Sequence, residues 1–201
     1  VRVPLSAPFY LGGEMRGETR RERYDSKTTE AKTFPVSLTA INFHCDENLG
    51  YLIRTAACFG ATAVNVIGCI PDKKELRAFS GSLVDYIQIN QFSTPEQFID
   101  YSRSENIELV SAELTEGATN LEQHSFDYDK KISIVVGNET TGVPTQILVN
   151  SKIIYIEMPG IGYCLNTAQT ANIMLYEAVK QYKKQISFFN SINEKQTPVL
   201  M

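Results

Sequence analysis

From residue 36 onward, apolar residues follow two alternating patterns. Short apolar runs rich in β-branched residues predict buried strands at Val36–Phe43, Ala63–Ile67, Val84–Ile89, Glu108–Ala112, Lys131–Val136 and Lys152–Glu157. Between them, apolar residues three or four positions apart predict helices at Asn48–Phe59, Thr94–Ser104, Pro144–Val149 and Asn166–Lys183. Strands that alternate with helices indicate an α/β domain whose mostly parallel sheet is covered by helices on both faces.

The two ends of the chain depart from this pattern. Residues 1–35 lack a strong period, and we interpret them as a short, partly basic N-terminal extension with one helix around Gly13–Thr29. The predicted globular domain spans residues 36–184. Residues 185–201 show no clear period, which predicts a loose tail or a contact with a partner.

Composition excludes several classes of protein. Of 201 residues, 43% are hydrophobic and 21% are charged, which fits one globular domain and excludes collagen, coiled coil and bulk disorder. No run approaches ~18 apolar residues, so we expect no transmembrane helix, and the first residues lack the apolar core of a secretory signal. Cysteines are scattered without a metal-binding spacing, so we expect reduced thiols, a cytoplasmic location and no metal site; they are Cys45, Cys58, Cys69 and Cys164.

Charge is distributed unevenly along the chain. The net charge is −4, and an acidic chain is not expected to be coated in nucleic acid. Residues 1–35, however, carry seven basic and five acidic side chains, a net of +2. Their cluster of Arg20, Arg21 and Arg23 is interleaved with glutamates. It is either a solvated helix face of alternating charge or an arm that contacts phosphates.

Candidate chemistry lies at the carboxyl ends of three predicted strands, where ligands bind in parallel α/β sheets. The first segment reads Asn48-Leu-Gly-Tyr-Leu-Ile-Arg54-Thr-Ala-Ala-Cys-Phe-Gly60. The second reads Gly137-Asn-Glu139-Thr-Thr-Gly142-Val, and the third reads Met158-Pro-Gly-Ile-Gly-Tyr-Cys164-Leu-Asn166. None contains the glycine-rich dinucleotide fingerprint or a P-loop.

Each segment taken alone also has an ordinary structural interpretation. Asn48 is placed as a helix N-cap, and Arg54 could be an ion-paired or snorkelling side chain on an apolar helix. The glycines of the second segment suit a tight strand-to-helix turn. The third segment could be a loop that ends in a helix cap at Asn166.

In this order, the three segments closely resemble the signature motifs of the SpoU family, the TrmH-like branch of the SPOUT RNA methyltransferases. The family shows N-x-G-x-x-x-R-T-A-x-x-F-G, then G-x-E-x-x-G-V, then S-L-N-x-x-x-A. The matching segments here begin at Asn48, Gly137 and Cys164, and Ser80-Gly81-Ser82 resembles a short polar segment of the family. The resemblance covers about residues 36–182.

The resemblance implies a fold, a reaction and partners. The fold would be an α/β sheet whose C-terminal part forms a trefoil knot. The protein would be a homodimer that binds S-adenosylmethionine in the knot and methylates a ribose 2′-hydroxyl of RNA, without a metal. Because residues 1–35 are short for a separate RNA-binding domain, we favour tRNA over rRNA as the substrate.

The resemblance also carries functional residues onto this chain. By position, the family's functional polar residues are Asn48, Arg54, Glu139 and Asn166. The expected cofactor-binding residues are Leu114, Gly137, Glu139, Ile156, Met158, Cys164 and Leu165. Arg54 and the N-terminal arginines Arg20, Arg21 and Arg23 are the expected RNA contacts.

Individual roles remain open at this point. Arg54 is either the general base or, since a guanidinium stays protonated, a group that grips the target phosphate and stabilises alkoxide charge. Asn48 and Asn166 would hold the loops and Arg54 in place, and Glu139 would fix backbone amides or pair with a basic residue. Cys164 replaces the family's usual Ser, which is harmless if only its backbone meets the cofactor. The alternative function is a non-catalytic RNA- or ribosome-binding protein that retains the fold.

Overall fold

The computed structural model describes residues 19–196, and side chains up to residue 189. The chain divides into two units, residues 1–32 and 33–201. In the first, helix α1 spans Arg20–Thr28 and begins with a capping box, in which Thr19 and Glu22 satisfy each other's backbone N–H groups. The three N-terminal arginines predicted to contact RNA lie on α1, which buries no side chain. The part of the predicted Gly13–Thr29 helix that precedes Thr19 lies outside the described residues.

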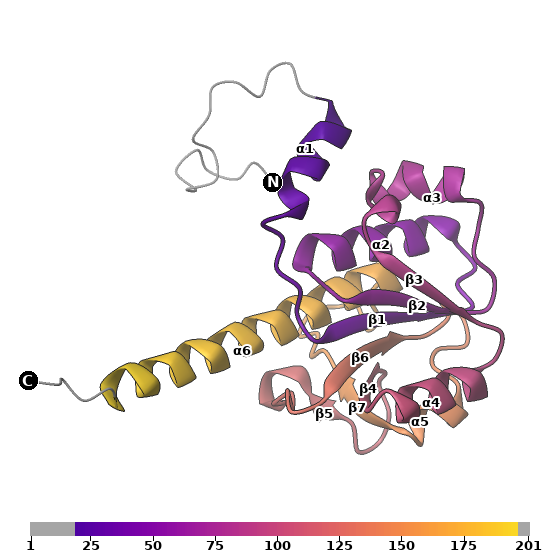
Figure 1. The fold of residues 1–201 in the computed structure, drawn as a ribbon. Coiled ribbons are helices and arrows are strands. Elements are labelled where there is room, and N and C mark those ends of the chain that lie inside the picture. The colour runs from indigo at the N-terminus through magenta and orange to yellow at the C-terminus, as the bar shows by residue number, and fades with distance from the viewer. Residues whose placement is uncertain (1–18, 197–201) are drawn as a thin grey trace, which may run out of the picture. The chain divides into compact units, whose positions relative to one another are not determined.

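The second unit is a seven-stranded parallel sheet in the order β3-β2-β1-β6-β4-β7-β5 (Figure 1). The strands are β1 Val36–Ile41, β2 Ala63–Ile67, β3 Gln88–Phe92, β4 Ile107–Ala112, β5 Thr119–Asn120, β6 Lys131–Val136 and β7 Ser151–Tyr155. The helices are α2 Asp46–Phe59, α3 Lys73–Ser80, α4 Pro95–Ser104, α5 Thr145–Leu148 and α6 Thr167–Gln196, with 3-10 turns at Leu83–Asp85 and Leu121–Gln123. The predicted α/β class is therefore confirmed.

Helices cover both faces of the sheet (Figure 1). On one face, α2 and α6 pack against the apolar side chains of β1, β2, β6 and β4, with Leu52 and Met174 fully buried. On the other face, Phe98 of α4 and Ile147 of α5 cover a smaller core. A row of buried polar side chains crosses that second face, in which Asn65 bonds Thr39 at 3.3 Å and Thr39 bonds Ser133 at 2.7 Å. These bonds satisfy polar groups that burial would otherwise leave without partners.

Three sequence predictions were wrong. Val84–Ile89 is not one strand, because Val84 lies in a 3-10 turn and β3 begins only at Gln88. The backbone N–H of Val84 donates to the Ser80 hydroxyl. Helix α3 was missed because its segment is strongly charged and buries only Leu76 and Ser80. The last helix does not end at Lys183 but continues to Gln196, and residues 197–201 lie outside the described residues.

The trefoil knot implied by the resemblance stays a prediction.

Of the helices in residues 19–196, none has the length and apolar character needed to cross a bilayer.

Candidate active site at the carboxyl ends of the central strands

A pocket of about 520 Å³ opens where β4, β6 and β7 end and α6 begins. Its walls come from three loops: residues 112–114 after β4, residues 136–142 after β6, and residues 154–167 between β7 and α6. The volume is in the range of small-molecule and cofactor sites. The structure brings all seven residues predicted to bind a cofactor into this lining: Leu114, Gly137, Glu139, Ile156, Met158, Cys164 and Leu165.

Two glycines give the loop after β6 its shape. A Cβ on Gly137 would lie 2.2 Å from the carbonyl carbon of Gly142, so the backbone can fold back on itself only at a glycine. Gly142 has a φ of +68°, which L side chains rarely adopt. Asn138 closes the turn, because its carboxamide oxygen accepts the N–H groups of Thr140 and Thr141 at 2.9 and 3.1 Å.

The next residue of this loop, Glu139, joins it to the first turn of α2. The Glu139 carboxylate accepts the backbone N–H of His44 at 2.9 Å, that of Cys45 at 3.4 Å, and the Asn48 Nδ2 at 2.6 Å. Cys45 is the N-cap of α2 and offers no side-chain cap of its own, so Glu139 supplies the negative group that a helix N-terminus favours. Partial burial raises the pKa of Glu139, but the hydrogen bonds from His44 and Asn48 outweigh it and lower the pKa below its ordinary value.

Asn48 also links the first turn of α2 to the start of the last helix, α6. Its Oδ1 accepts the Asn166 Nδ2 at 2.9 Å, and the Asn166 Oδ1 accepts the N–H of Ala168 at 2.9 Å. Asn166 is therefore the N-cap of α6, as predicted. Asn48 is not the N-cap of α2: it lies three residues after Cys45, in the first turn, where its buried side chain bridges two other elements. Glu139, Asn48 and Asn166 thus form one hydrogen-bonded chain across the three sequence motifs.

A sequence profile of the SpoU rRNA Methylase family matches residues 35–176. The chain belongs to this family. It is 30% identical over 140 residues to the 23S rRNA (guanosine-2'-O-)-methyltransferase RlmB of Acinetobacter baylyi, covering 67% of this chain and 55% of that one. It is 25% identical over 178 residues to the tRNA (guanosine(18)-2'-O)-methyltransferase of Aquifex aeolicus, covering 88% of this chain and 81% of that one.

A solved structure supports the same relationship. The AdoMet-bound rRNA methyltransferase from Sinorhizobium meliloti superposes with a TM-score of 0.68 at 25% identity, covering 75% of this chain and 57% of that one. The chain spans 55% to 60% of the length of several curated relatives that it matches.

Of the four functional polar residues carried over from the family, Arg54 is the one whose side chain does not bond the others within the described residues. It is exposed on α2 and does not line the pocket. Within the described residues it makes no hydrogen bond or ion pair, and the side-chain contacts of Asn48 and Asn166 go elsewhere. The expectation that these two asparagines hold Arg54 in place finds no support in the contacts of this chain.

Cys164 lies on the exposed loop that leads into α6 and lines the pocket. No hydrogen bond of its thiol is found among the described residues. The neighbouring side chains Ile161 and Tyr163 are 103% and 83% exposed, which is unusual for large apolar groups.

Sequence reasoning missed a second carboxylate at the pocket, Glu113. One of its oxygens accepts the N–H of Val143 at 2.9 Å and the other accepts the N–H of Leu114 at 3.2 Å. Glu113 therefore ties the loop after β4 to the loop after β6. The signal was available, since an acid directly after the buried strand β4 is placed much as Glu139 is placed after β6.

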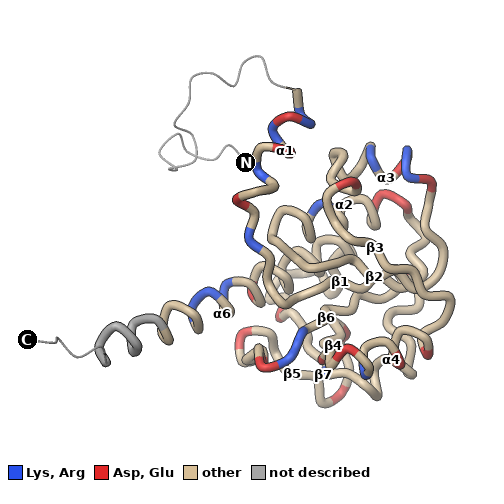
Figure 2. Tube along the Cα trace, viewed as in Figure 1, with Lys and Arg blue, Asp and Glu red and all other residues tan. Residues whose placement is uncertain are grey.

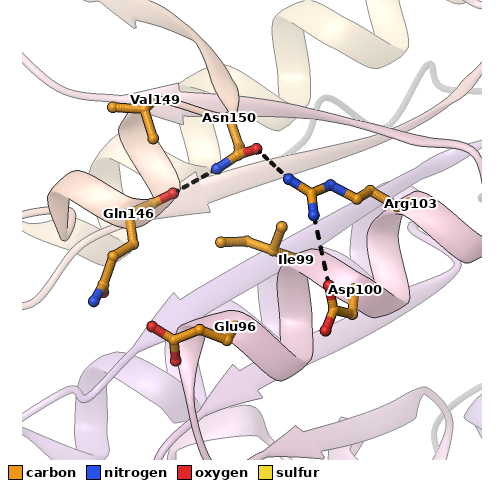
Figure 3. Close-up of a pocket in the computed structure, with 7 residues that line it drawn as sticks. All are labelled: Glu96, Ile99, Asp100, Arg103, Gln146, Val149 and Asn150. Carbon is orange, nitrogen blue, oxygen red and sulfur yellow. Dashed lines mark hydrogen bonds and ion pairs between the residues drawn. The ribbon is translucent and has the colours of Figure 1, made fainter.

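A second, smaller hollow of about 290 Å³ lies between α4 and α5 (Figure 3). Three of its polar side chains bond one another: Arg103 donates to the Asn150 Oδ1 at 2.9 Å and faces Asp100 at 3.6 Å. It contains none of the motif residues. Nor is any group of three or more His, Cys, Asp or Glu side chains in the described residues arranged to hold a metal ion.

Proposed function

We propose that this protein transfers the methyl group of S-adenosylmethionine to a ribose 2′-hydroxyl of RNA, with tRNA as the favoured substrate. The observation that carries the proposal is the hydrogen-bonded chain Glu139–Asn48–Asn166 at the edge of the pocket. It joins the loop after β6 to the first turn of α2, and it joins that turn to Asn166, where the loop after β7 meets α6. Such a rigid frame suits a site that must hold two reactants in one geometry.

The residues of the pocket fit S-adenosylmethionine. Gly137 and Gly142 line the cavity, so this part of its wall carries no side chain, and the apolar residues Leu114, Ile156 and Met158 line it as well. Thr167, in the first turn of α6, lines the cavity, and its buried Oγ1 has no hydrogen-bond partner in the structure. A buried hydroxyl without a partner is costly, and a bound ligand would satisfy it.

S-adenosylmethionine, when bound, supplies a methyl group already activated on a sulfonium. The protein must then orient the 2′-oxygen in line with that methyl; as the O–CH3 bond forms, the S–CH3 bond would break to leave a neutral thioether, and the hydroxyl proton would pass to solvent. Glu139 is committed to two backbone amides and Asn48, so it acts by holding the loop. Arg54 is charged and exposed, so we assign it the contact with the target phosphate and the developing alkoxide.

A homodimer and a cytoplasmic location are part of the proposal. The loop at the pocket exposes Ile161 and Tyr163, and α6 exposes Ile173 and Tyr176. Together these large apolar side chains suit an interface with a second copy, which would complete the site around Arg54. All four cysteines are free thiols, which fits a reducing compartment.

The proposal is tested by incubating the protein with tritium-labelled S-adenosylmethionine and either tRNA or rRNA, followed by nuclease digestion and nucleoside analysis. We expect label in a 2′-O-methylnucleoside from the tRNA pool. Both pools are needed because the relatives include tRNA and rRNA enzymes. Absence of label together with absence of cofactor binding by calorimetry would contradict the proposal and favour a non-catalytic RNA-binding protein.

A further inference from the structure

Helix α6 continues far beyond the part of the chain that the family shares. It spans 30 residues, about 45 Å, whereas the family match ends at residue 176. Ala178 and Val179 are still buried, and the Tyr182 ring packs edge-on against Phe34 and Tyr128. Residues 183–189 are all exposed, and the helix extends past the strands (Figure 1). The sheet domain therefore leaves the surface of residues 183–189 open to solvent.

The extension concentrates positive charge in an acidic chain. Residues 177–189 carry three lysines and one glutamate, a net of +2, while the whole chain has −4. Lys180, Lys183 and Lys184 are spaced by three and four positions, so they share one side of the helix, and Phe188 follows Lys184 by four on the same side. Figure 2 shows this basic band on α6 where the helix leaves the sheet. We call these four residues the α6 basic face.

The contacts of the α6 basic face leave its charge largely uncompensated. Lys180 forms an ion pair with Glu177, and the Lys183 Nζ lies 5.2 Å from the centre of the Phe34 ring. The ring orients the Lys183 ammonium without neutralising it. One carboxylate therefore serves three cations. Phe188, one turn after Lys184, is 64% exposed, and its ring meets the Phe189 ring edge-on with centroids 6.4 Å apart.

We propose that the α6 basic face binds unpaired RNA, with the lysines on phosphates and Phe188 stacked on a base. This inference rests on the proposed function, because the RNA is the substrate of that reaction. Lysines beside an exposed aromatic ring are the combination that binds single strands without reading sequence. A second copy is a poorer occupant, since a two-fold contact would bring two sets of these lysines together.

The test measures the affinity of the full chain for a fluorescein-labelled oligouridine across a range of salt concentrations. The combined variant Lys180→Gln, Lys183→Gln, Lys184→Gln should lower the slope of log K against log salt by about 2, since each phosphate contact to a single strand contributes about 0.7. Phe188→Ala should weaken binding about tenfold through the loss of stacking. Thermal melts of each variant establish that the fold is retained.

A matched control sharpens the result. Lys73→Gln, Lys74→Gln, Lys131→Gln removes the same charge from α3 and β6. This control should bind RNA nearly as the unaltered protein does. An unchanged salt slope in the α6 variant, or an equal loss in the Lys73 control, would overturn the inference. So would a change of oligomeric state without a change in RNA affinity.

Parallel methyl-transfer assays separate this inference from the proposed function. Transfer by the unaltered protein with no RNA-binding defect in the α6 variant would remove the inference and leave the function. RNA binding that depends on the α6 basic face without any transfer would do the reverse. If the unaltered protein neither binds RNA nor transfers methyl, both are wrong.

Discussion

The Glu139 carboxylate receives the Asn48 side chain at 2.6 Å, although the two residues are 91 positions apart in the sequence. This bond joins the loop after β6 to the first turn of α2. Asn48 in turn accepts a hydrogen bond from Asn166 at the start of α6. Three segments that a sequence pattern marks as separate motifs are therefore one hydrogen-bonded unit. A change at any member is expected to loosen the other two.

Replacing Glu139 tests this unit directly. Glu139→Ala removes the acceptor of three hydrogen bonds, and because the side chain is partly solvated we expect a loss of only about 1–2 kcal/mol in the free energy of unfolding. Glu139→Gln keeps an acceptor oxygen and should lose less. Urea denaturation of both variants measures the difference. Equal stability of Glu139→Ala and the unaltered protein would show that the chain of bonds is dispensable.

Acid should weaken the same contact. The pKa of Glu139 is lower in the folded protein than its ordinary value of 4.5, so its contribution is present above that pH and is lost as pH falls through the folded pKa. The stability gap between the unaltered protein and Glu139→Gln should therefore narrow below about pH 4.5. Urea midpoints measured against pH for both proteins check this, and a constant gap would contradict it.

Gly142 tests the shape of the pocket loop. An Ala at a φ of +68° costs about 1 kcal/mol, and its Cβ would lie 2.5 Å from the Glu113 Oε2. Gly142→Ala should therefore weaken the bond from Val143 to Glu113 and lower the affinity for S-adenosylmethionine. Gly160→Ala is the matched control, because no atom lies within 4 Å of its Cβ position. Calorimetric titration compares the two, and equal affinities would contradict the prediction.

Periodicity predicted the central sheet well because its strands are buried and apolar. β2 and β6 have the predicted bounds, and the helices predicted at Asn48–Phe59 and Thr94–Ser104 are observed as α2 and α4. Periodicity failed to predict helix α3, which is charged on most of its surface. It also failed to predict the end of α6, residues 184–196, which have no sheet to face. An apolar stripe predicts a helix only where something covers that stripe.

The site was predictable to a different degree. Local sequence could place Gly137 and Glu139 at a strand end, but it could not show that Glu139 would cap a helix through partners 91–95 residues earlier in the chain. Glu113 was missed for the same reason, since its partner Val143 is 30 residues away. Arg54 is the opposite case. The sequence motif groups it with the other functional residues, but in the fold of one chain it is exposed and does not line the pocket.

His124 should make stability depend on pH near neutrality. It is half-buried, and within the described residues its Nε2 has no hydrogen-bond partner. Burial together with Lys152 lowers the pKa of His124 below 6.5, against the opposing effect of Glu108. Because the folded state resists protonation, the contribution is present above the unfolded pKa of about 6.5 and is lost as pH falls below it. His124→Gln should flatten this part of the stability profile. An NMR titration in which His124 protonates above pH 6.5 would refute the assignment.

Cys164 tests whether the unusual residue of the third motif matters through its side chain. Its thiol makes no hydrogen bond among the described residues, and the residue is exposed on the loop that lines the pocket. Cys164→Ser should therefore keep methyl transfer and S-adenosylmethionine affinity close to those of the unaltered protein. Complete loss of transfer in Cys164→Ser would show that the thiol itself takes part.

Arg54 separates chemistry from framework most cleanly. Because the side chain is exposed and unbonded within the described residues, Arg54→Ala should change the free energy of unfolding by no more than about 0.5 kcal/mol and leave S-adenosylmethionine affinity unchanged. Transfer should fall by about 10²–10³-fold or more, the size of effect seen when a group that stabilises developing negative charge is removed. Single-turnover transfer measured against pH completes the test. Arg54→Lys keeps the charge and should recover part of the rate if the residue binds phosphate and alkoxide, whereas an active Arg54→Ala would remove the role assigned to it.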